Sequence, residues 1–258
     1  MPKFFCISDI HGYYDEMIYA LNNAGFDRND TNHWLIVCGD CFDRGYKNVD
    51  VYNFLTSLDR KIIIKGNHES LLMECVTRGY PLRHDISNGT AQTILDFGDS
   101  NEFKKACKTT GKLLGEFIES MPYYFETKNY VFVHGWLPPM LGEYNSVICV
   151  IHPQWQQATS EEWEKGMWRN GMAMFFRKET IEKTVVCGHW HASYGHCVKG
   201  HCPDEFGNRA CFDPYIEDGI MAIDGCTAHT GKCNVVVIED DFHDDFIAKG
   251  DMIYESKE

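Results

Sequence analysis

The stretch Gly39-Asp40-Cys41-Phe42-Asp43-Arg44-Gly45 directly follows an apolar run of strand length at residues 34–38. An apolar run that ends abruptly in Gly-Asp is typical of a buried strand that carries charge at its C-terminal end. A carboxylate at such a strand end can hold a metal ion, and a neighbouring arginine can bind an anion through its planar guanidinium. The stretch therefore indicates either a chemical site or an acidic turn, and the strands beside it decide between the two.

Two further apolar runs flank this stretch in the sequence, and each of them also ends in a polar cluster. Helical apolar stripes separate the three runs, and this alternation of strand and helix predicts parallel strands with right-handed crossovers. We therefore expect the three clusters to share the sheet edge at which α/β proteins bind ligands. The flanking runs are residues 4–8, which lead to Asp9 and His11, and residues 62–64, which lead to Asn67 and His68.

The second half of the chain repeats the pattern with strand-like runs that end in histidine. Residues 130–133 precede His134, and residues 184–187 precede His189 and His191. A lone histidine at a strand end is more often structural than functional. Five polar clusters at successive strand ends are not independent accidents, so we interpret them as one site.

These clusters resemble the motifs of the metallophosphoesterase superfamily. The Asp43-Arg44-Gly45 ending is typical of its phosphoprotein phosphatase branch, which includes bacterial and phage-type Ser/Thr phosphatases and symmetrical diadenosine tetraphosphate hydrolases. The resemblance implies an α/β fold, a four-layer α/β/β/α calcineurin-like sandwich with a metal site at the strand ends. The motifs are D-x-H at 9–11, G-D-x-x-D-R-G at 39–45, G-N-H-E at 66–69, H-G at 134–135 and G-H-x-H at 188–191.

The resemblance also implies a dinuclear metal centre. Its mixture of carboxylate and amide oxygens with imidazoles suits Mn²⁺, Fe or Zn²⁺ better than Ca²⁺, and we expect two divalent ions, with Mn²⁺ first among the alternatives. A shared carboxylate would hold the ions about 3.5–4 Å apart, the spacing used for in-line displacement. The implied ligands are Asp9 and His11 for one metal, Asp40 as the bridge, and Asn67, His134 and His189 for the other.

The chemistry implied by the resemblance is single-step hydrolysis of a phosphate ester by direct attack of metal-bound water, without a covalent phospho-enzyme. Arg44 and Asn67 would bind the phosphoryl group. His68 would protonate the leaving group as the general acid, because Asp43 beside it raises the imidazole pKa and keeps the ring protonated near neutrality.

Three features of the second half leave alternatives open. The branch has a second phosphate-binding arginine after a tryptophan, for which Arg169 fits best and Arg177 competes. His191 is typical of generic metallophosphoesterases and is either a metal ligand or a hydrogen-bonding neighbour of one. The loop at 196–211 carries histidine and cysteine, but its spacings do not match a tetrahedral zinc framework, so an irregular loop is the alternative to a zinc site.

The composition of the chain argues against some classes of partner and favours one cellular compartment. The formal charge of -14 argues against a nucleic-acid partner, since a phosphate backbone needs a basic surface. No run approaches the roughly 18 apolar residues of a membrane span, and no apolar leader precedes Asp9. The twelve cysteines are scattered rather than framed, which favours free buried thiols in the cytoplasm.

The 258 residues predict a single domain over 1–258 with a helical insertion at 70–121. This insertion is either scaffold or a rim that shapes substrate choice. In the segment 138–177, we expect Trp155, Trp163 and Trp168 to cover the core. We expect the acidic residues 239–241 and 244–245 to be solvated.

Two substrate classes fit the implied centre, and a Ser/Thr-type protein phosphatase acting on a phosphorylated protein or peptide is placed first. The alternative is a hydrolase of diadenosine tetraphosphate or a related nucleotide phosphoanhydride, because the same metal centre serves both. A non-catalytic metal-binding domain would show a broken site, whereas every primary ligand is present.

Overall fold

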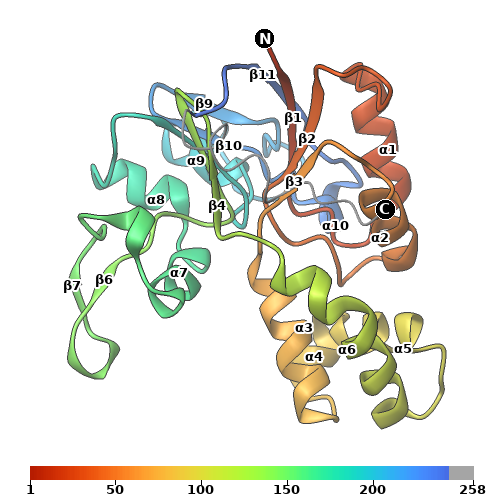
Figure 1. Ribbon diagram of the computed structural model, residues 1–258. Coiled ribbons are helices and arrows are strands. Elements are labelled where there is room, and N and C mark those ends of the chain that lie inside the picture. Colours follow the sequence, from red (N-terminus) through yellow and green to blue (C-terminus); the bar gives the residue numbers. More distant parts are fainter. Residues whose placement is uncertain (244–258) are drawn as a thin grey trace.

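The computed structural model describes residues 1–243 and shows two β-sheets that face each other, with helices on their outer faces (Figure 1). The first sheet has the strand order β11-β1-β2-β3, and the second has the order β4-β5-β8-β10-β9. The strands are β1 (Lys3–Ile7), β2 (His33–Val37), β3 (Lys61–Ile63), β4 (Tyr124–Glu126), β5 (Tyr130–Val133), β6 (Met140–Leu141), β7 (Val147–Cys149), β8 (Thr184–Cys187), β9 (Tyr215–Glu217), β10 (Ile220–Ala222) and β11 (Val236–Glu239).

Parallel pairing brings the polar strand ends together. In the first sheet β2 lies parallel to both β1 and β3, and in the second sheet β8 lies parallel to both β5 and β10. The carboxyl ends of each parallel set therefore point the same way, as the alternation of strands and helices predicts. Strands β11, β4 and β9 pair antiparallel at the sheet margins, and β6 and β7 form a separate hairpin.

The strands divide their apolar side chains between two faces, because successive residues of a strand point to opposite sides. In β1, Phe4 and Cys6 pack between the sheets, while Phe5 and Ile7 pack against helices. On the outer face of the second sheet, Val131 and Val185 join a core that includes α7 and α8 residues. The predicted four-layer α/β/β/α arrangement is confirmed.

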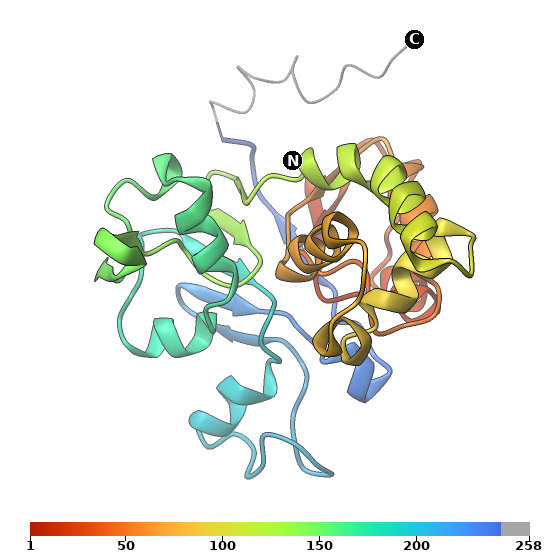
Figure 2. The same ribbon diagram turned by 90° about the horizontal axis from the view of Figure 1, so that it is seen from below.

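Helices α3 to α6 form a group beside the first sheet, apart from α7 and α8 (Figures 1 and 2). Helix α3 begins at Asn67, within the G-N-H-E motif, where the Glu69 carboxylate accepts the Gly66 N–H at the start of the helix. The helices are α1 (Tyr14–Asn23), α2 (Asn48–Thr56), α3 (Asn67–Arg78), α4 (Arg83–Ser87), α5 (Thr90–Gly98), α6 (Phe103–Glu119), α7 (Ser160–Met167), α8 (Gly171–Phe176), α9 (Ser193–Val198) and α10 (Thr227–Thr230), with 3₁₀ turns η1 (Glu143–Asn145) and η2 (Trp155–Gln157).

Two expectations about solvent exposure are wrong. Trp155 and Trp163 are buried, as expected, but Trp168 is 52% exposed. In the acidic segment, Asp240 is buried and accepts hydrogen bonds from Thr127 and Asn129, so it joins the end of β11 to the start of β5. Residues 244–245, and the predicted domain from 244 to 258, lie outside the described residues. Across residues 1–243, the structure contains no helix that is both long enough and apolar enough to cross a membrane.

Candidate metal and phosphate site

Asp40 belongs to two clusters of metal-ligand side chains at the carboxyl ends of the parallel strands. One cluster joins Asp40 with His11 and His68, and the other joins it with His134 and His189, with all ligand atoms of a cluster within 4.8 Å of one another. The two Asp40 oxygens are divided between them: Oδ2 lies 3.6 Å from His11 Nε2, and Oδ1 lies 3.4 Å from His134 Nε2. This division of the two oxygens suits a carboxylate that bridges two metal ions.

Three histidines around Asp40 each bind a backbone group through one ring nitrogen. A carbonyl oxygen only accepts, so the ring nitrogen on it must carry the proton, and a neutral imidazole then has a bare lone pair on its other nitrogen. Metal-binding histidines in proteins are commonly fixed in this way. The pairs are His11 Nδ1 with Phe42 O at 2.9 Å, His134 Nδ1 with Cys38 O at 2.8 Å, and His189 with the backbone of Trp168.

The lone pairs at the centre face acceptors rather than donors. His134 Nε2 lies 2.7 Å from the Asn67 Oδ1 atom as well as near Asp40. His11 Nε2 faces Asp40 Oδ2 and, at 3.9 Å, Asp9 Oδ1. Acceptors that converge in a buried space without a donor between them are the environment of a bound cation. The residues present therefore fit a metal centre.

The electrostatics of the site point the same way. Burial lowers the pKa of His134 and lowers that of His189 to about 3, so both rings are in the neutral, metal-binding form. Burial raises the pKa of Asp40, but the positive charge that the surrounding histidines carry when they are protonated lowers it by more, and that pKa lies below its usual range. Burial, Asp224 and Asp40 together raise the pKa of Asp9, because buried carboxylates repel one another.

The backbone at the site is held in a conformation that is uncommon for residues other than glycine. Left-handed φ angles cost energy for side chains with a Cβ, and they persist where the surrounding structure enforces them, often at functional sites. Candidate residues account for six of the eleven such cases described. They are Asp9 (φ 51°), His11 (φ 50°), Asp40 (φ 55°), Asp43 (φ 75°), Arg44 (φ 63°) and His189 (φ 64°).

His68, a member of one of these clusters, is in contact with Asp43, its predicted partner. His68 Nδ1 lies 2.8 Å from Asp43 Oδ2, and Arg44 Nη2 lies 3.2 Å from His68 Nε2. Burial lowers the pKa of His68, but Asp40 and the hydrogen-bonded Asp43 outweigh it, and the pKa is raised overall. A raised imidazole pKa beside an arginine suits proton donation to a phosphate leaving group.

Sequence reasoning missed two residues that hold the acid pair. Thr90 donates to Asp43 Oδ2 at 2.5 Å, and Thr93 donates to Asp43 Oδ1 at 2.9 Å. Both threonines are fully buried and belong to α5, outside the motifs. Helical periodicity alone marks them only as polar residues of a helix, so no signal in the sequence identifies this contact.

Two further buried carboxylates had no assigned role. Glu69 accepts backbone N–H bonds from Asp40, Cys41 and Gly66, and so joins the loop after β2 to the start of α3. Gly66 fits here because a Cβ would lie 2.3 Å from the Asp40 carboxylate. Asp224 follows β10, and burial raises its pKa to about 6. Its position after a strand end is the signal that could have found it.

Arg169 is bound by protein partners in the structure. Its guanidinium forms an ion pair with Glu179 and donates to the carbonyl oxygens of Leu137 at 3.1 Å and Val150. These contacts provide no support for the prediction that Arg169 binds phosphate, and they indicate that it joins the ends of several loops.

His191 lies outside both ligand clusters. Its Nδ1 is 2.8 Å from Ser193 Oγ, and its Nε2 is 3.2 Å from Glu205 Oε1. In the cysteine- and histidine-bearing loop, the Nδ1 atoms of His196 and His201 lie 3.3 Å apart. Within residues 1–243, the two clusters around Asp40 are the only groups of three or more metal-ligand side chains, and neither includes this loop.

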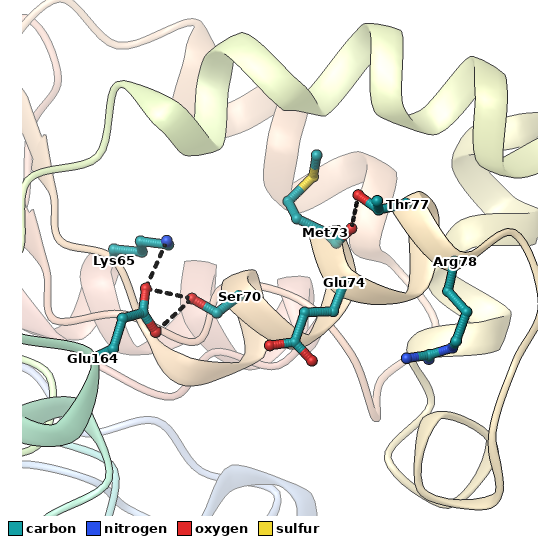
Figure 3. A pocket seen from close by; sticks show the side chains of 7 residues that line it. All are labelled: Lys65, Ser70, Met73, Glu74, Thr77, Arg78 and Glu164. Carbon is teal, nitrogen blue, oxygen red and sulfur yellow. Dashed lines mark hydrogen bonds and ion pairs between the residues drawn. The ribbon is translucent and has the colours of Figure 1, made fainter. Parts of the chain in front are cut away.

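A groove of about 560 Å³ runs along α3, the helix that carries Asn67 and His68 (Figure 3). Glu164 of α7 lies at one end of it and accepts from Lys65 at 3.1 Å, from Ser70 at 3.2 Å and from the Tyr123 hydroxyl at 3.3 Å. Arg78 at the other end is paired with Asp85 on α4. Each cation of the groove is therefore neutralised by a carboxylate, so the groove offers no unpaired cation to bind a phosphate group.

Curated relatives of the chain are nucleotide hydrolases. The symmetrical bis(5'-nucleosyl)-tetraphosphatase of Nitrosococcus oceani is 25% identical over 69% of this chain and 57% of its own length. The asymmetrical bis(5'-nucleosyl)-tetraphosphatase PrpE of Bacillus velezensis is 35% identical over 46% of this chain and 49% of its own length. The chain thus spans about half the length of these relatives.

The fold is shared with solved phosphoesterase structures. One of a protein described provisionally as a diadenosine tetraphosphatase has a TM-score of 0.53 at 16% identity, covering 92% of this chain and 91% of that one. The model of the calcineurin-like phosphoesterase family matches residues 2–225, which include every candidate site residue described above. The chain therefore belongs to the calcineurin-like phosphoesterase family.

Proposed function

We propose that the chain hydrolyses dinucleoside polyphosphates such as diadenosine tetraphosphate at a dinuclear metal centre built around Asp40. The observation that carries this proposal is the similarity to bis(5'-nucleosyl)-tetraphosphatases, in a chain whose site brings two ligand clusters to one carboxylate. The sequence motifs placed a Ser/Thr-type protein phosphatase first, and the relatives favour the alternative. Mn²⁺ and a cytoplasmic location stay predictions.

The side chains around Asp40 have complementary roles in this proposal. Divalent ions would be held by the ligands that the resemblance implies, which leave His68 free as a proton donor, and they would supply Lewis-acid activation of water and of the phosphoryl oxygens. One ion would have Asp9, His11 and Asp40, and the other would have Asp40, Asn67, His134 and His189. Arg44 would hold non-bridging oxygens through its guanidinium. His68 would donate a proton to the departing nucleotide phosphate, and Asp43 keeps the imidazole in place through the 2.8 Å contact.

A panel of substrates tests the proposal. We expect the Mn²⁺-loaded chain to give a higher kcat/KM for diadenosine tetraphosphate than for a phosphoserine peptide or para-nitrophenyl phosphate. Chromatography of the products separates symmetrical cleavage, which yields two ADP, from asymmetrical cleavage, which yields ATP and AMP. An Asp40→Asn variant serves as the inactive control. Preference for the phosphopeptide would restore the protein phosphatase interpretation.

A further inference from the structure

Three large aromatic side chains lie exposed on the loops next to the candidate site. Trp168, at the C-terminal end of α7, is 52% exposed, Trp190 is 38% exposed and Phe206 is 52% exposed. We call these three residues the aromatic rim. Tryptophan and phenylalanine that stay in solvent at the edge of a polar site are available to pack against a ligand.

The two tryptophans of the aromatic rim are in contact with one of the two candidate ligand clusters. The ring centroid of Trp168 lies 5.9 Å from that of His189 at 83°, and the Trp190 centroid lies 6.2 Å from it. Both indoles thus contact the same histidine of the Asp40 cluster. In a nucleotide one ribose separates the base from the nearest phosphate, so a phosphate bound at that cluster brings its base close to the cluster.

The chemistry of the rim favours a nucleobase as its occupant. Every nucleobase has a flat π-face, and stacking on an exposed aromatic side chain is tolerant of the base. The groove along α3 offers neither an exposed aromatic face nor an unpaired cation. On the basis of the proposed function, we propose that Trp168 and Trp190 stack on a nucleobase of the substrate and so select nucleotides.

The rim also explains the contacts of His191. The His191 ring packs on Phe206 at a centroid distance of 4.5 Å and lies 6.0 Å from Trp190 at 32°. Its nitrogens are held by Ser193 and Glu205, which belongs to the same loop as Phe206. His191 therefore positions the rim: a His191→Ala variant should weaken nucleotide binding and leave the metal content unchanged.

Calorimetric titration with ADP and with inorganic pyrophosphate tests this inference, because the two ligands share a diphosphate and differ in the nucleoside. In the Mn²⁺-loaded chain, we expect Trp168→Ala combined with Trp190→Ala to weaken ADP binding by between about fivefold and about 150-fold. Pyrophosphate binding should change far less. Phenylalanine at both positions should restore part of the affinity for ADP. Tyr19→Ala is the matched control, since Tyr19 is a 71% exposed aromatic residue on α1, on the far flank of the first sheet (Figure 1).

The outcomes separate this inference from the proposed function. Equal weakening of ADP and pyrophosphate, or wild-type affinity for ADP in the double alanine variant, would overturn the stacking role even if diadenosine tetraphosphate is hydrolysed. Selective loss of ADP binding in a chain that does not hydrolyse diadenosine tetraphosphate would support the rim and overturn the proposed function.

Discussion

The hydroxyl of Thr90 offers a sharp test of how the fold holds the acid pair. It donates to Asp43 Oδ2, the same oxygen that His68 Nδ1 approaches at 2.8 Å, and both Thr90 and Asp43 are fully buried. Thr90→Val removes this donor and keeps the shape of the side chain. Water cannot readily replace a donor in a buried space, so the carboxylate loses a hydrogen bond outright.

The expected loss follows from the charge of the acceptor. A hydrogen bond to a charged group contributes about 1.5–3 kcal/mol, so we expect Thr90→Val to lower the free energy of unfolding by that amount. Thr93→Val should lower the free energy of unfolding by less. The single hydroxyl proton of Thr93 is shared between Asp43 and the Gly89 carbonyl oxygen at 3.2 Å, so its bond to the carboxylate is weaker. The two losses should not add, since both hydroxyls act on Asp43.

Urea unfolding followed by circular dichroism measures the change, with a constant m-value as the check that the unfolding reaction is the same. Thr109→Val is the control, because Thr109 is an exposed helical threonine that bonds only to the Lys105 carbonyl. It should change stability by less than about 0.5 kcal/mol. Thr90→Ser should recover most of the stability and of kcat. A Thr90→Val chain as stable as wild type, or a serine variant as impaired as the valine one, would refute the reasoning.

Three further predictions concern neighbouring contacts. Arg169→Ala should lower the free energy of unfolding by about 3 kcal/mol, because Glu179 loses its partner, and should leave KM within about twofold; a large rise in KM with unchanged stability would assign Arg169 to phosphate. His68→Asn should lower kcat more for an alkyl phosphomonoester than for diadenosine tetraphosphate, because an alkoxide needs the proton more than a nucleotide phosphate does; an equal loss would contradict the acid role. Burial and Glu164 raise the pKa of Tyr123 in the folded chain to about 12, whereas a tyrosine in the unfolded chain ionises near pH 10. The contribution of this difference to the free energy of unfolding should therefore be complete below about pH 10 and be lost as the pH rises to about 12. Glu164→Gln should lower the Tyr123 pKa in an ultraviolet titration, and an unchanged pKa would contradict the contact.

The strand-end site was predictable because it depends on short-range patterns. An apolar run followed by a fixed polar motif gives both the strand and the place of Asp40 or His134, and parallel pairing brings such ends together. The contacts of Thr90 and Asp240 were not predictable, since each joins residues more than 40 positions apart through tertiary packing.

The exposure of Trp168 and the position of His191 each have a specific local cause. In α7 the buried stripe runs through Trp163, Gly166 and Met167, and Trp168 follows at the helix end, off that stripe. His189 has a left-handed φ of 64°, so the chain turns between it and His191 instead of continuing as a strand. A residue spacing measured on an extended segment therefore does not place His191 at the metal cluster.

Metal content per chain tests the shared-carboxylate centre most directly. The chain is loaded with Mn²⁺, freed of unbound metal by gel filtration, and its metal is counted by mass spectrometry. We expect about two ions per wild-type chain, about one in His134→Asn and close to none in Asp40→Asn. The reason is that only Asp40 belongs to both clusters. Circular dichroism of each variant shows that the fold is retained. An Asp40→Asn chain that keeps both ions, or a wild-type chain that binds a single ion, would contradict the proposed centre.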